Sequence, residues 1–242
     1  MKLITLNTWG GRVREPFIKF IENNKDIDIF CFQEIYDKAE KEMSAEYPED
    51  MLNLFTDLKV LLPEHLGFFR PALLGVYGIA IFIKKNIIVL EEGEKFIHVS
   101  SSTAVTDGHH SRNLQWIKFN FNGKVYTVMN VHGLWNGKGK NDTPERIAQS
   151  NTIREFMDTT ENQKILCGDF NLNPDTESIK IVEGGMKNLV RDYSITSTRT
   201  SFYEKPGKFA DYIFTSPDIV IKDFMVLPDE VSDHSPLFIE FE

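Results

Sequence analysis

The stretch NLQWIKFNFNGKVYTVMNVH (residues 113–132) predicts a β-hairpin in the middle of the chain. Its two halves are rich in aromatic, β-branched and aliphatic residues, which favour strands. Between them lies Asn122-Gly123, a pair that two-residue hairpin turns prefer because such turns need positive φ angles. We therefore expect two antiparallel strands here, with other strands arranged around them.

Strand-like runs continue on both sides of this hairpin. The run IDIFCFQ (residues 27–33) is nearly all apolar, which is typical of a central strand buried on both faces. A charged break interrupts the run that begins at Ile87. The other predicted strands cover residues 2–7, 77–85, 87–99, 164–170, 211–216, 219–227 and 235–242.

Helical patterns separate several of these strands. Apolar residues recur at helical spacing after Pro16, and Thr143 followed by Pro144 is typical of a helix start. The predicted helices cover residues 17–24, part of 38–60, 143–159 with Ile147, Ile153 and Phe156 facing inward, and a segment after Asp175.

The order of these elements predicts an α/β (α+β) fold. Strands outnumber helices, and hairpins alternate with helical crossovers, which favours a mixed sheet or a pair of packed sheets with helices outside. No internal repeat and no linker rich in Ser, Gly or Pro divides the chain. We expect a single domain over residues 1–242.

Composition narrows the function. The chain has 27 Lys plus Arg against 36 Asp plus Glu, so its net charge of −9 argues against a protein that coats nucleic acid through bulk positive charge. A local basic groove or a metal ion remains compatible with a phosphate substrate. No run approaches the roughly 20 apolar residues of a membrane span, and the amino terminus is too short in apolar residues for an export signal. Cys31 and Cys167 lie in apolar runs and are expected to be free thiols in the core, as in a reducing compartment. We expect a soluble, cytoplasmic and monomeric protein.

Acidic, amide and imidazole side chains recur where predicted strands end. Each has an ordinary alternative, such as a turn, a helix cap or a hydrogen-bonded histidine. Their repetition instead favours one functional site, because rigid strands aim side chains at one end of a sheet. The residues concerned are Asn7, Gln33, Glu34, Asn130, His132, Asp169, Asn171, Asp211, Asp233 and His234.

These residue types fit phosphoester hydrolysis at a divalent metal. Mg²⁺ needs one or two carboxylates, with water and substrate phosphate completing its oxygen shell. Hydrolysis further needs a group that orients water, donors for the developing charge and a polarised imidazole. Spacings typical of a zinc site, a phosphate-binding Gly-rich loop or a serine nucleophile elbow are absent from the sequence. His65, His98, His109 and His110 have no acidic partner at ligand spacing, and we interpret them as loop or surface residues.

Six short motifs follow one another along the chain: LNTWGGR (6–12), FQEIY (32–36), NVHG (130–133), GDFN (168–171), ADYIF (210–214) and SDHSP (232–236). In this order they resemble the motifs of the endonuclease/exonuclease/phosphatase superfamily. The resemblance spans residues 6 to 236 and implies a four-layer α-β-β-α sandwich with two packed mixed or antiparallel sheets, both facing one cleft.

The resemblance also implies roles for individual residues. Glu34 resembles the principal ligand of Mg²⁺ (or Mn²⁺), with Asn7 beside it and Asp233 as a second carboxylate on the metal side. Asp169 is similar to the residue that orients or deprotonates the attacking water, and Asn171 to its phosphate-binding neighbour.

The histidines follow the same comparison. His234 resembles the imidazole that contacts the scissile phosphate, and Asp211 the carboxylate that orients it. If the strands at 210–214 and 235–242 are neighbours, these two residues meet, and the carboxylate should raise the pKa of His234 above about 6.5. His132 resembles a histidine that donates to the phosphate or leaving group, while Arg112 and Arg199 are minor candidates for cleft charge.

The branch of the superfamily stays open. Ile35-Tyr36 after Gln33-Glu34, together with His132, disfavours the abasic-site endonucleases, and the Asn-Thr-Trp order differs from that of tyrosyl-DNA phosphodiesterases. The segment DTPERIAQS (142–150) is similar to an Arg-x-x-Gln helix of several branches. We place a nuclease or other phosphodiesterase acting on DNA or RNA first. The alternatives are a phosphatase, a lipid phosphodiesterase and, least favoured, a binding module without catalysis.

Overall fold

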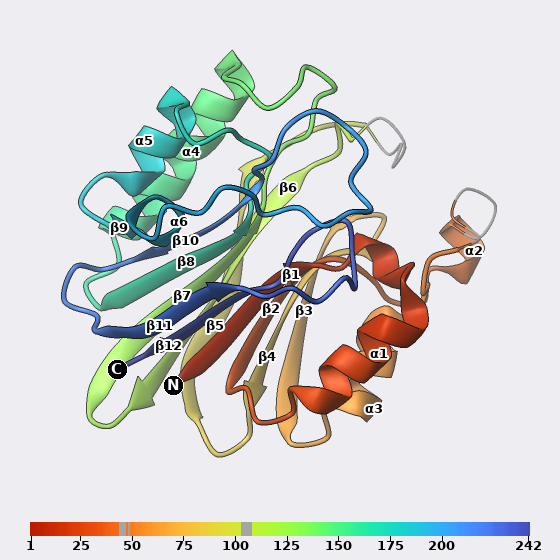
Figure 1. Ribbon diagram of the computed structural model, residues 1–242, viewed down its shortest axis with the longest axis horizontal. Coiled ribbons are helices and arrows are strands. Elements are labelled where there is room, and N and C mark those ends of the chain that lie inside the picture. Colours follow the sequence, from red (N-terminus) through yellow and green to blue (C-terminus); the bar gives the residue numbers. More distant parts are fainter. Residues whose placement is uncertain (44–46, 48, 103–107) are drawn as a thin grey trace.

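Two six-stranded sheets pack face to face, and helices cover the outer face of each (Figure 1). The computed structural model describes residues 1–43, 47, 49–102 and 108–242. One outer face carries α1 (Arg14–Asn23) and α3 (Leu54–Leu61), and the other carries α4 (Pro144–Asp158), α5 (Glu177–Glu183) and α6 (Leu189–Asp192). This four-layer arrangement confirms the expected fold class.

The first sheet has the order β11-β12-β1-β2-β4-β3 and is mixed, because β1 and β2 run parallel whereas the other pairs are antiparallel. Its strands are β1 (Lys2–Asn7), β2 (Ile29–Tyr36), β3 (His65–Leu73), β4 (Tyr77–Lys84), β11 (Ile221–Val226) and β12 (Leu237–Phe241).

The second sheet has the order β5-β6-β7-β8-β10-β9, and β7 and β8 form its parallel pair. The predicted hairpin is β6 and β7, and its turn residues Asn122 and Gly123 have φ angles of 51° and 78°, as the sequence required. The strands are β5 (Ile88–His98), β6 (Arg112–Phe121), β7 (Lys124–His132), β8 (Gln163–Asp169), β9 (Lys187–Asn188) and β10 (Asp211–Thr215).

Alternation along the central strands explains why their sequences are almost wholly apolar. Successive side chains of a strand point to opposite faces, and here both faces are buried. One set packs between the two sheets with the buried free thiols Cys31 and Cys167, while the other packs against α1 and α3. Leu3, Ile29, Cys31, Ile81 and Ile83 belong to the first set, and Ile4, Leu6, Phe30, Phe32 and Phe82 to the second.

Three sequence predictions need correction. The strand β3 was not predicted, and its first residue, His65, is buried and hydrogen-bonded through Nε2 to Ile27 O at 2.8 Å instead of lying on the surface. On α4, Ile153 is buried as expected, but Ile147 and Phe156 are only half-buried. The buried side of α4 instead includes Arg146, Gln149, Ser150 and Met157.

The strands β10 and β12 are not neighbours. They belong to different sheets, which face each other, so the starts of these strands meet across the sandwich. The helix predicted within residues 38–60 is two short helices, α2 (Glu40–Met43) and α3, and residues 44–46 and 48 between them lie outside the described residues. A 3-10 turn, Trp9–Gly11, follows β1. Over the described residues, no helix is both long and apolar enough to cross a membrane.

Candidate active site

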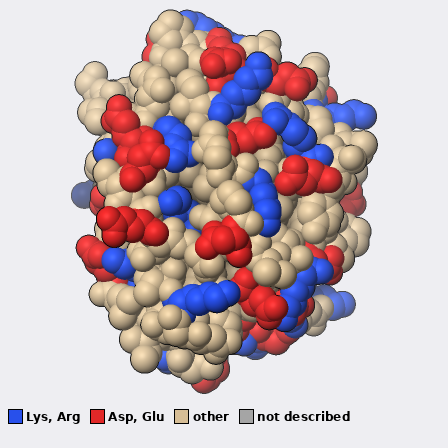
Figure 2. Space-filling model, turned by 90° about the vertical axis from the view of Figure 1, so that its left-hand side faces the viewer, with Lys and Arg blue, Asp and Glu red and all other residues tan. Residues whose placement is uncertain are grey.

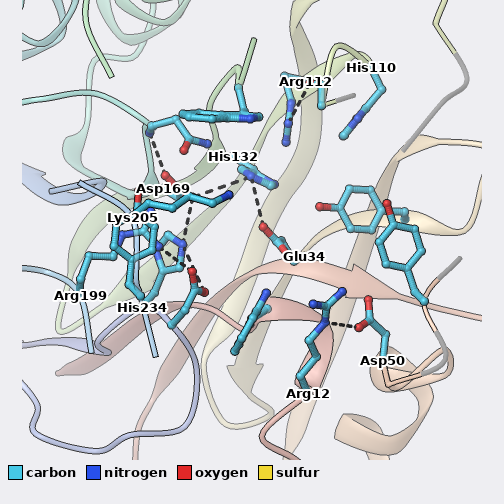
Figure 3. A pocket seen from close by; sticks show the side chains of 18 of the residues that line it. Arg12, Glu34, Asp50, His110, Arg112, His132, Asp169, Arg199, Lys205 and His234 are labelled. Carbon is cyan, nitrogen blue, oxygen red and sulfur yellow. Dashed lines mark hydrogen bonds and ion pairs between the residues drawn. The ribbon is translucent and has the colours of Figure 1, made fainter. Parts of the chain in front are cut away.

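The predicted site residues meet at one end of the sandwich. Asn7, the last residue of β1, pairs with Gln33 of β2, while His132, Asp169 and Asp211 lie side by side at the ends of β7, β8 and β10. A cavity of about 260 Å³ opens between the two sheets at this end (Figure 3). Of the predicted residues, those that line it are Glu34, Arg112, His132, Asp169, Asn171, Arg199, Asp233 and His234, whereas Asn7 and Asp211 lie behind them.

Glu34 enters the cavity because β2 is irregular at this residue. The pairing register of β2 with β4 shifts between Gln33 and Ile35, and Glu34 has a φ of 58°. A non-glycine residue in this left-handed region is strained, so the surrounding structure must hold it. Thr8 does so, since its hydroxyl donates to the carbonyl oxygens of Gln33 and Glu34, both at 3.0 Å.

Asn7 links the two central carboxylates. Its Nδ2 donates to Glu34 Oε1 at 2.9 Å and to Asp169 Oδ2 at 3.0 Å, while its Oδ1 accepts from the Trp9 amide at 3.0 Å. The two carboxylates, which come from different sheets, therefore converge on one point. Asn7 directs its amide nitrogen toward these two carboxylates. Its side-chain oxygen could bind a metal ion there only if the amide group rotated by about half a turn.

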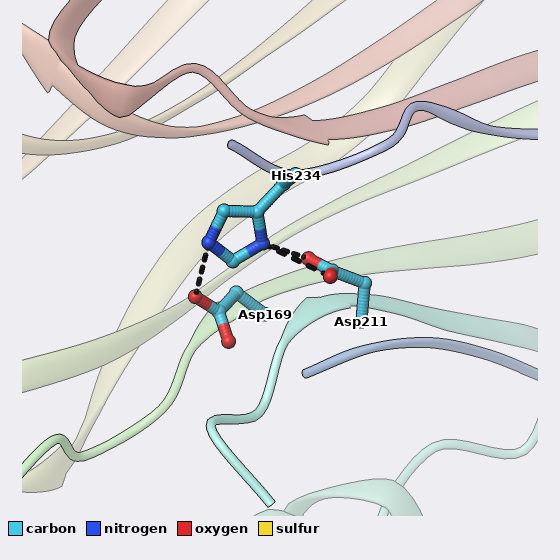
Figure 4. A group of neighbouring side chains, drawn as sticks. All are labelled: Asp169, Asp211 and His234. Atoms are coloured by element: carbon cyan, nitrogen blue, oxygen red, sulfur yellow. Dashed lines mark hydrogen bonds and ion pairs between the residues drawn. The ribbon is translucent and has the colours of Figure 1, made fainter. Parts of the chain in front are cut away.

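His234 lies between two carboxylates (Figure 4). Its Nδ1 is 2.8 Å from Asp211 Oδ1, and its Nε2 is 3.6 Å from Asp169 Oδ2. Thr198 fixes Asp211 by donating to its Oδ2 at 2.9 Å. The expected Asp211–His234 contact is thus present, although the strands that carry it lie in different sheets.

The expected rise in the pKa of His234 is not found. Burial, followed by the positive charge of Arg199, lowers the pKa of His234 to about 4, and these effects outweigh Asp233 and Asp169. Burial also raises the pKa of Asp211 to about 6. A neutral ring that donates from Nδ1 to Asp211 leaves Nε2 facing the cavity as an acceptor.

His132 and Asn171 complete the wall around Asp169. His132 Nε2 is 3.9 Å from Glu34 Oε1 and 3.8 Å from Asp169 Oδ2. The Asn171 backbone amide donates to Asp169 Oδ1 at 2.8 Å, and its side chain donates to Gly133 O at 3.3 Å. Asp169 is consequently fixed at one oxygen and turned toward Asn7 and His234 with the other.

The Arg-x-x-Gln segment of α4 holds the chain that follows His132. Gln149 Oε1 accepts from the Leu134 amide at 2.8 Å, and Arg146 Nε donates to Leu134 O at 3.2 Å. These contacts explain why a polar side of α4 is buried.

Cationic side chains surround the carboxylates. Arg199 pairs with Asp233 at 3.0 Å, and Arg112 donates to Gly108 O at 3.2 Å, but Arg112 Nε and Nη1 have no hydrogen-bond partner among the described residues. Lys140 and Lys205 also line the cavity, and sequence reasoning missed both. Burial lowers the pKa of Lys140 to about 8, with Arg199 acting in the same direction.

His110 lies in the loop before β6, which agrees with its interpretation as a loop or surface residue, but it is buried and does not lie on the surface. Its side chain lines the cavity, is only 2% exposed, and packs edge-on against Tyr77. Neither ring nitrogen has a hydrogen-bond partner within the part of the chain that the structure describes. His98 is half-buried in β5 and His109 is exposed.

Gln33 and Asn130 do not line the cavity. Gln33 Nε2 donates to Asn130 Oδ1 at 2.7 Å, and Asn130 Nδ2 donates to Phe32 O at 3.0 Å. Because these residues belong to different sheets, their amides join the two sheets beneath the site.

The electrostatics fit a bound cation. Burial, with the negative charges of Asp233 and Asp169, raises the pKa of Glu34 to about 7, although the Asn7 hydrogen bond opposes this rise. Such mutual repulsion among carboxylates is what a hard divalent ion relieves. Asp169, Asp211 and His234 also offer atoms close enough together to hold an ion. However, His234 Nδ1 and Asp211 already hydrogen-bond each other, so these atoms are engaged with each other in this structure.

Comparisons with known proteins agree with this architecture. A family model described as "Endonuclease/Exonuclease/phosphatase family" matches residues 4–234. No curated protein sequence matches the chain significantly.

Solved structures show the same fold at low sequence identity. The Bacteroides thetaiotaomicron mannosyl-6-phosphatase Bt3783 has a TM-score of 0.76 and 20% identity, over 100% of this chain and 99% of that chain. Humanized TDP2 from D. rerio has a TM-score of 0.75 and 15% identity, with coverage of 100% and 98%. ANGEL2, a 2′,3′-cyclic phosphatase, has a TM-score of 0.72 and 13% identity, with coverage of 99% and 94%.

Proposed function

The chain belongs to the endonuclease/exonuclease/phosphatase family of phosphoester hydrolases, and from this premise we propose that it hydrolyses a small phosphoester by direct attack of water, with Mg²⁺ or Mn²⁺ as cofactor. The observation that carries the proposal is the convergence of Glu34 and Asp169, from different sheets, beside the imidazoles of His132 and His234. A single domain, a monomeric state and a cytoplasmic location remain predictions.

In this proposal Glu34, with Asp169 and Asp233 nearby, would hold the ion, and Asn7 would join them if its amide turns. A divalent ion in such a site polarises the phosphoryl oxygen and increases the acidity of bound water. The donor set supports this assignment, because carboxylate and amide oxygens are the ligands that Mg²⁺ and Mn²⁺ prefer.

The remaining residues have separable roles. Asp169, fixed by the Asn171 amide, is placed to accept a hydrogen bond from the attacking water and to orient it. Asn171 and His132 would donate to phosphoryl oxygens, and Arg112 and Arg199 would add positive charge near the developing phosphorane. His234, held by Asp211, would accept a hydrogen bond at Nε2 from the attacking water or from a protonated oxygen of the substrate.

The shape of the site favours a small substrate. The cavity of about 260 Å³ is lined by side chains from both sheets and is open on one side, and its volume lies just below the range of about 300–1,000 Å³ that is typical of small-molecule sites. On the face shown in Figure 2, which is the left-hand side of the view in Figure 1, acidic side chains lie among the basic ones, and the described residues drawn there form no continuous basic surface. The mannosyl-6-phosphatase fold neighbour is consistent with this preference.

Cleavage of DNA or RNA is the second candidate. The cationic residues Arg112, Lys140, Arg199 and Lys205 at the cavity favour it, because two or more phosphates could be bound there. A substrate panel separates the two candidates: hexose phosphates, 4-nitrophenyl phosphate, bis-4-nitrophenyl phosphate, plasmid DNA, single-stranded DNA and RNA.

We predict that activity on this panel is lost in excess EDTA and restored by Mg²⁺ or Mn²⁺. Glu34→Gln should weaken Mn²⁺ binding by at least about 10-fold in isothermal titration, because an anionic oxygen is replaced by a neutral amide. Glu22→Gln on the exposed side of α1 is the matched control and should bind Mn²⁺ like the wild type. Full turnover by metal-free enzyme in EDTA would overturn the proposal.

A further inference from the structure

The turn after β1 is built for close approach to a segment far away in the sequence. Gly10 and Gly11 have φ angles of 63° and 75°, and a Cβ atom at Gly10 would lie 2.6 Å from Asp50 Oδ2. The Met51 amide donates to Gly10 O at 2.8 Å, which docks the segment at Asp50 onto the turn. The sequence Trp9-Gly10-Gly11-Arg12 therefore does more than end a strand, because it brings Arg12 to Asp50.

Arg12 and Asp50 form a fixed ion pair in the cavity wall. Arg12 Nε donates to Asp50 Oδ1 at 2.5 Å, and the guanidinium carbon lies 5.1 Å from the centre of the Trp9 ring. The Asp50 side chain is only 3% exposed. Among the described residues, Arg12 hydrogen-bonds through Nε alone, and its side chain is 28% exposed, so none of these residues occupies its two terminal nitrogens.

This pair lies apart from the groups assigned to water and phosphate. In Figure 3, Asp169 and His234 lie on one side of Glu34, and Arg12 and Asp50 lie on the other. Both sets line the same cavity, so a phosphoryl group at Glu34 has room to direct its ester substituent toward Arg12.

The chemistry of the pair selects among substituents. A second phosphate would be repelled by Asp50, and an alkyl chain would offer no acceptor to the terminal nitrogens of Arg12. A hydroxyl group both donates and accepts, so of two adjacent hydroxyls one can donate to Asp50 while the other accepts from Arg12.

We propose that Arg12 and Asp50 bind the leaving group of the substrate, and that this group is a polyhydroxylated ring, either a sugar or a cyclitol. The proposal rests on the proposed function, since it assigns a substrate class to the same cavity. Tyr36, which lies against Asp50, and Tyr77 add hydroxyl groups on this side of the cavity. Asp50 and Arg12 are positioned by each other, so the pair acts as one unit.

The test compares selectivity. For each variant, kcat/KM is measured for glucose 6-phosphate, mannose 6-phosphate, myo-inositol 1-phosphate and thymidine 5′-monophosphate, each divided by kcat/KM for 4-nitrophenyl phosphate. In Asp50→Asn and in Arg12→Lys, the ratio for the preferred polyol phosphate should fall at least about 10-fold, mainly through KM, because one charge-assisted hydrogen bond is weakened. Asp158→Asn on α4 is the matched control, since it removes the acid of an exposed Arg–Asp pair.

A binding measurement makes the test independent of turnover. Saturation-transfer NMR with free glucose, mannose and myo-inositol should detect contact with the wild-type protein and lose it in Asp50→Asn, while thermal melting checks that each variant is folded. A polyol preference that survives both substitutions would overturn the proposal. So would a preference for thymidine 5′-monophosphate that depends on Asp50, because it would indicate a nucleobase instead. If no phosphoester is hydrolysed but polyols bind through Asp50, the proposed function is wrong, whereas the assignment of Arg12 and Asp50 to polyol binding is confirmed.

Discussion

The His234 ring shows how one residue depends on its neighbours. Asp211 accepts at Nδ1 and Asp169 approaches Nε2, so the ring has one orientation and one favoured tautomer. We predict that Asp211→Asn lowers kcat by about 10-fold or more with little effect on KM, because the amide keeps the shape of the carboxylate but not its charge. His234→Ala should lower kcat further.

The double variant separates an orienting role from an independent one. If Asp211 acts only through the imidazole, Asp211→Asn combined with His234→Ala should cost little beyond His234→Ala alone. Steady-state kinetics on the substrate that the panel identifies measure all three variants. Losses that multiply in the double variant would show that the two residues act independently, and the orienting role would be abandoned.

Sequence reasoning found the residues of this site better than it found their contacts. Carboxylates and imidazoles at strand ends are unusual locally, which is why Glu34, Asp169 and His234 were identified. The sequence around Asp50 carries no such signal, because the role proposed for Asp50 depends on its contact with Arg12, which lies 38 positions away. The pKa of His234 was predicted in the wrong direction, since burial and the charge of Arg199 cannot be read from its own motif.

At the scale of elements, the irregularity in β2 decides where Glu34 points. We predict that Thr8→Val destabilises the protein by about 1–3 kcal/mol, because the Glu34 carbonyl oxygen loses the hydroxyl donor and the Gln33 carbonyl oxygen keeps only the Thr8 amide, while the side-chain shape is kept. It should also weaken Mn²⁺ binding, since the strained backbone at Glu34 is no longer held. Urea denaturation and isothermal titration measure the two effects.

Thr152→Val provides the matched comparison for Thr8→Val. Thr152 likewise donates its hydroxyl to a backbone carbonyl, that of Ala148 at 3.1 Å, but on the exposed side of α4. Its loss should change stability by less than Thr8→Val and leave Mn²⁺ binding unaltered. An equal stability loss in both variants, with unchanged metal binding, would show that the conformation of Glu34 does not depend on Thr8.

Elements with local signals were predicted well, and those without them were not. The β6–β7 hairpin has its Asn-Gly turn, and α4 has Thr143 as a cap that accepts from the Arg146 amide. The strand β3 contains Gly67 and Pro71 and is mostly half-buried, so its pattern is weak. Whether β10 and β12 share a sheet is a long-range property that neither strand's sequence contains.

At the scale of the whole molecule, the site lies where two sheets from distant parts of the sequence meet. The Gln33–Asn130 amide contact joins the sheets, and β1, β2, β7 and β8 all end at the cavity. The titratable side chains of the site are therefore buried in the centre of the fold. The free-energy cost of burying them should appear in the free energy of global unfolding and in its dependence on pH.

The pH dependence of that unfolding is a sum of opposing contributions. Groups with raised folded-state pKa values, Glu34 at about 7 and Asp211 at about 6, contribute stability at low pH that is lost as the pH rises through those values. Buried histidines contribute in the opposite sense, because the unfolded chain takes up protons that the folded chain does not. A difference between two variants isolates one such group.

His110 is suited to this measurement. Burial, with a smaller effect of Arg112 and then His98, lowers the pKa of His110 to about 3. Between its unfolded value of about 6.5 and this folded value, only the unfolded chain binds the proton, so stability present above pH 6.5 is lost as the pH falls. At pH 5 the loss attributable to His110 should be about 2 kcal/mol relative to pH 7.5. His110→Phe keeps a ring against Tyr77 but cannot titrate, so urea denaturation at the two pH values should show a loss smaller by that amount. An identical loss in the variant and the wild type would mean that His110 does not carry this dependence, and that its ring is protonated or solvated in the folded protein.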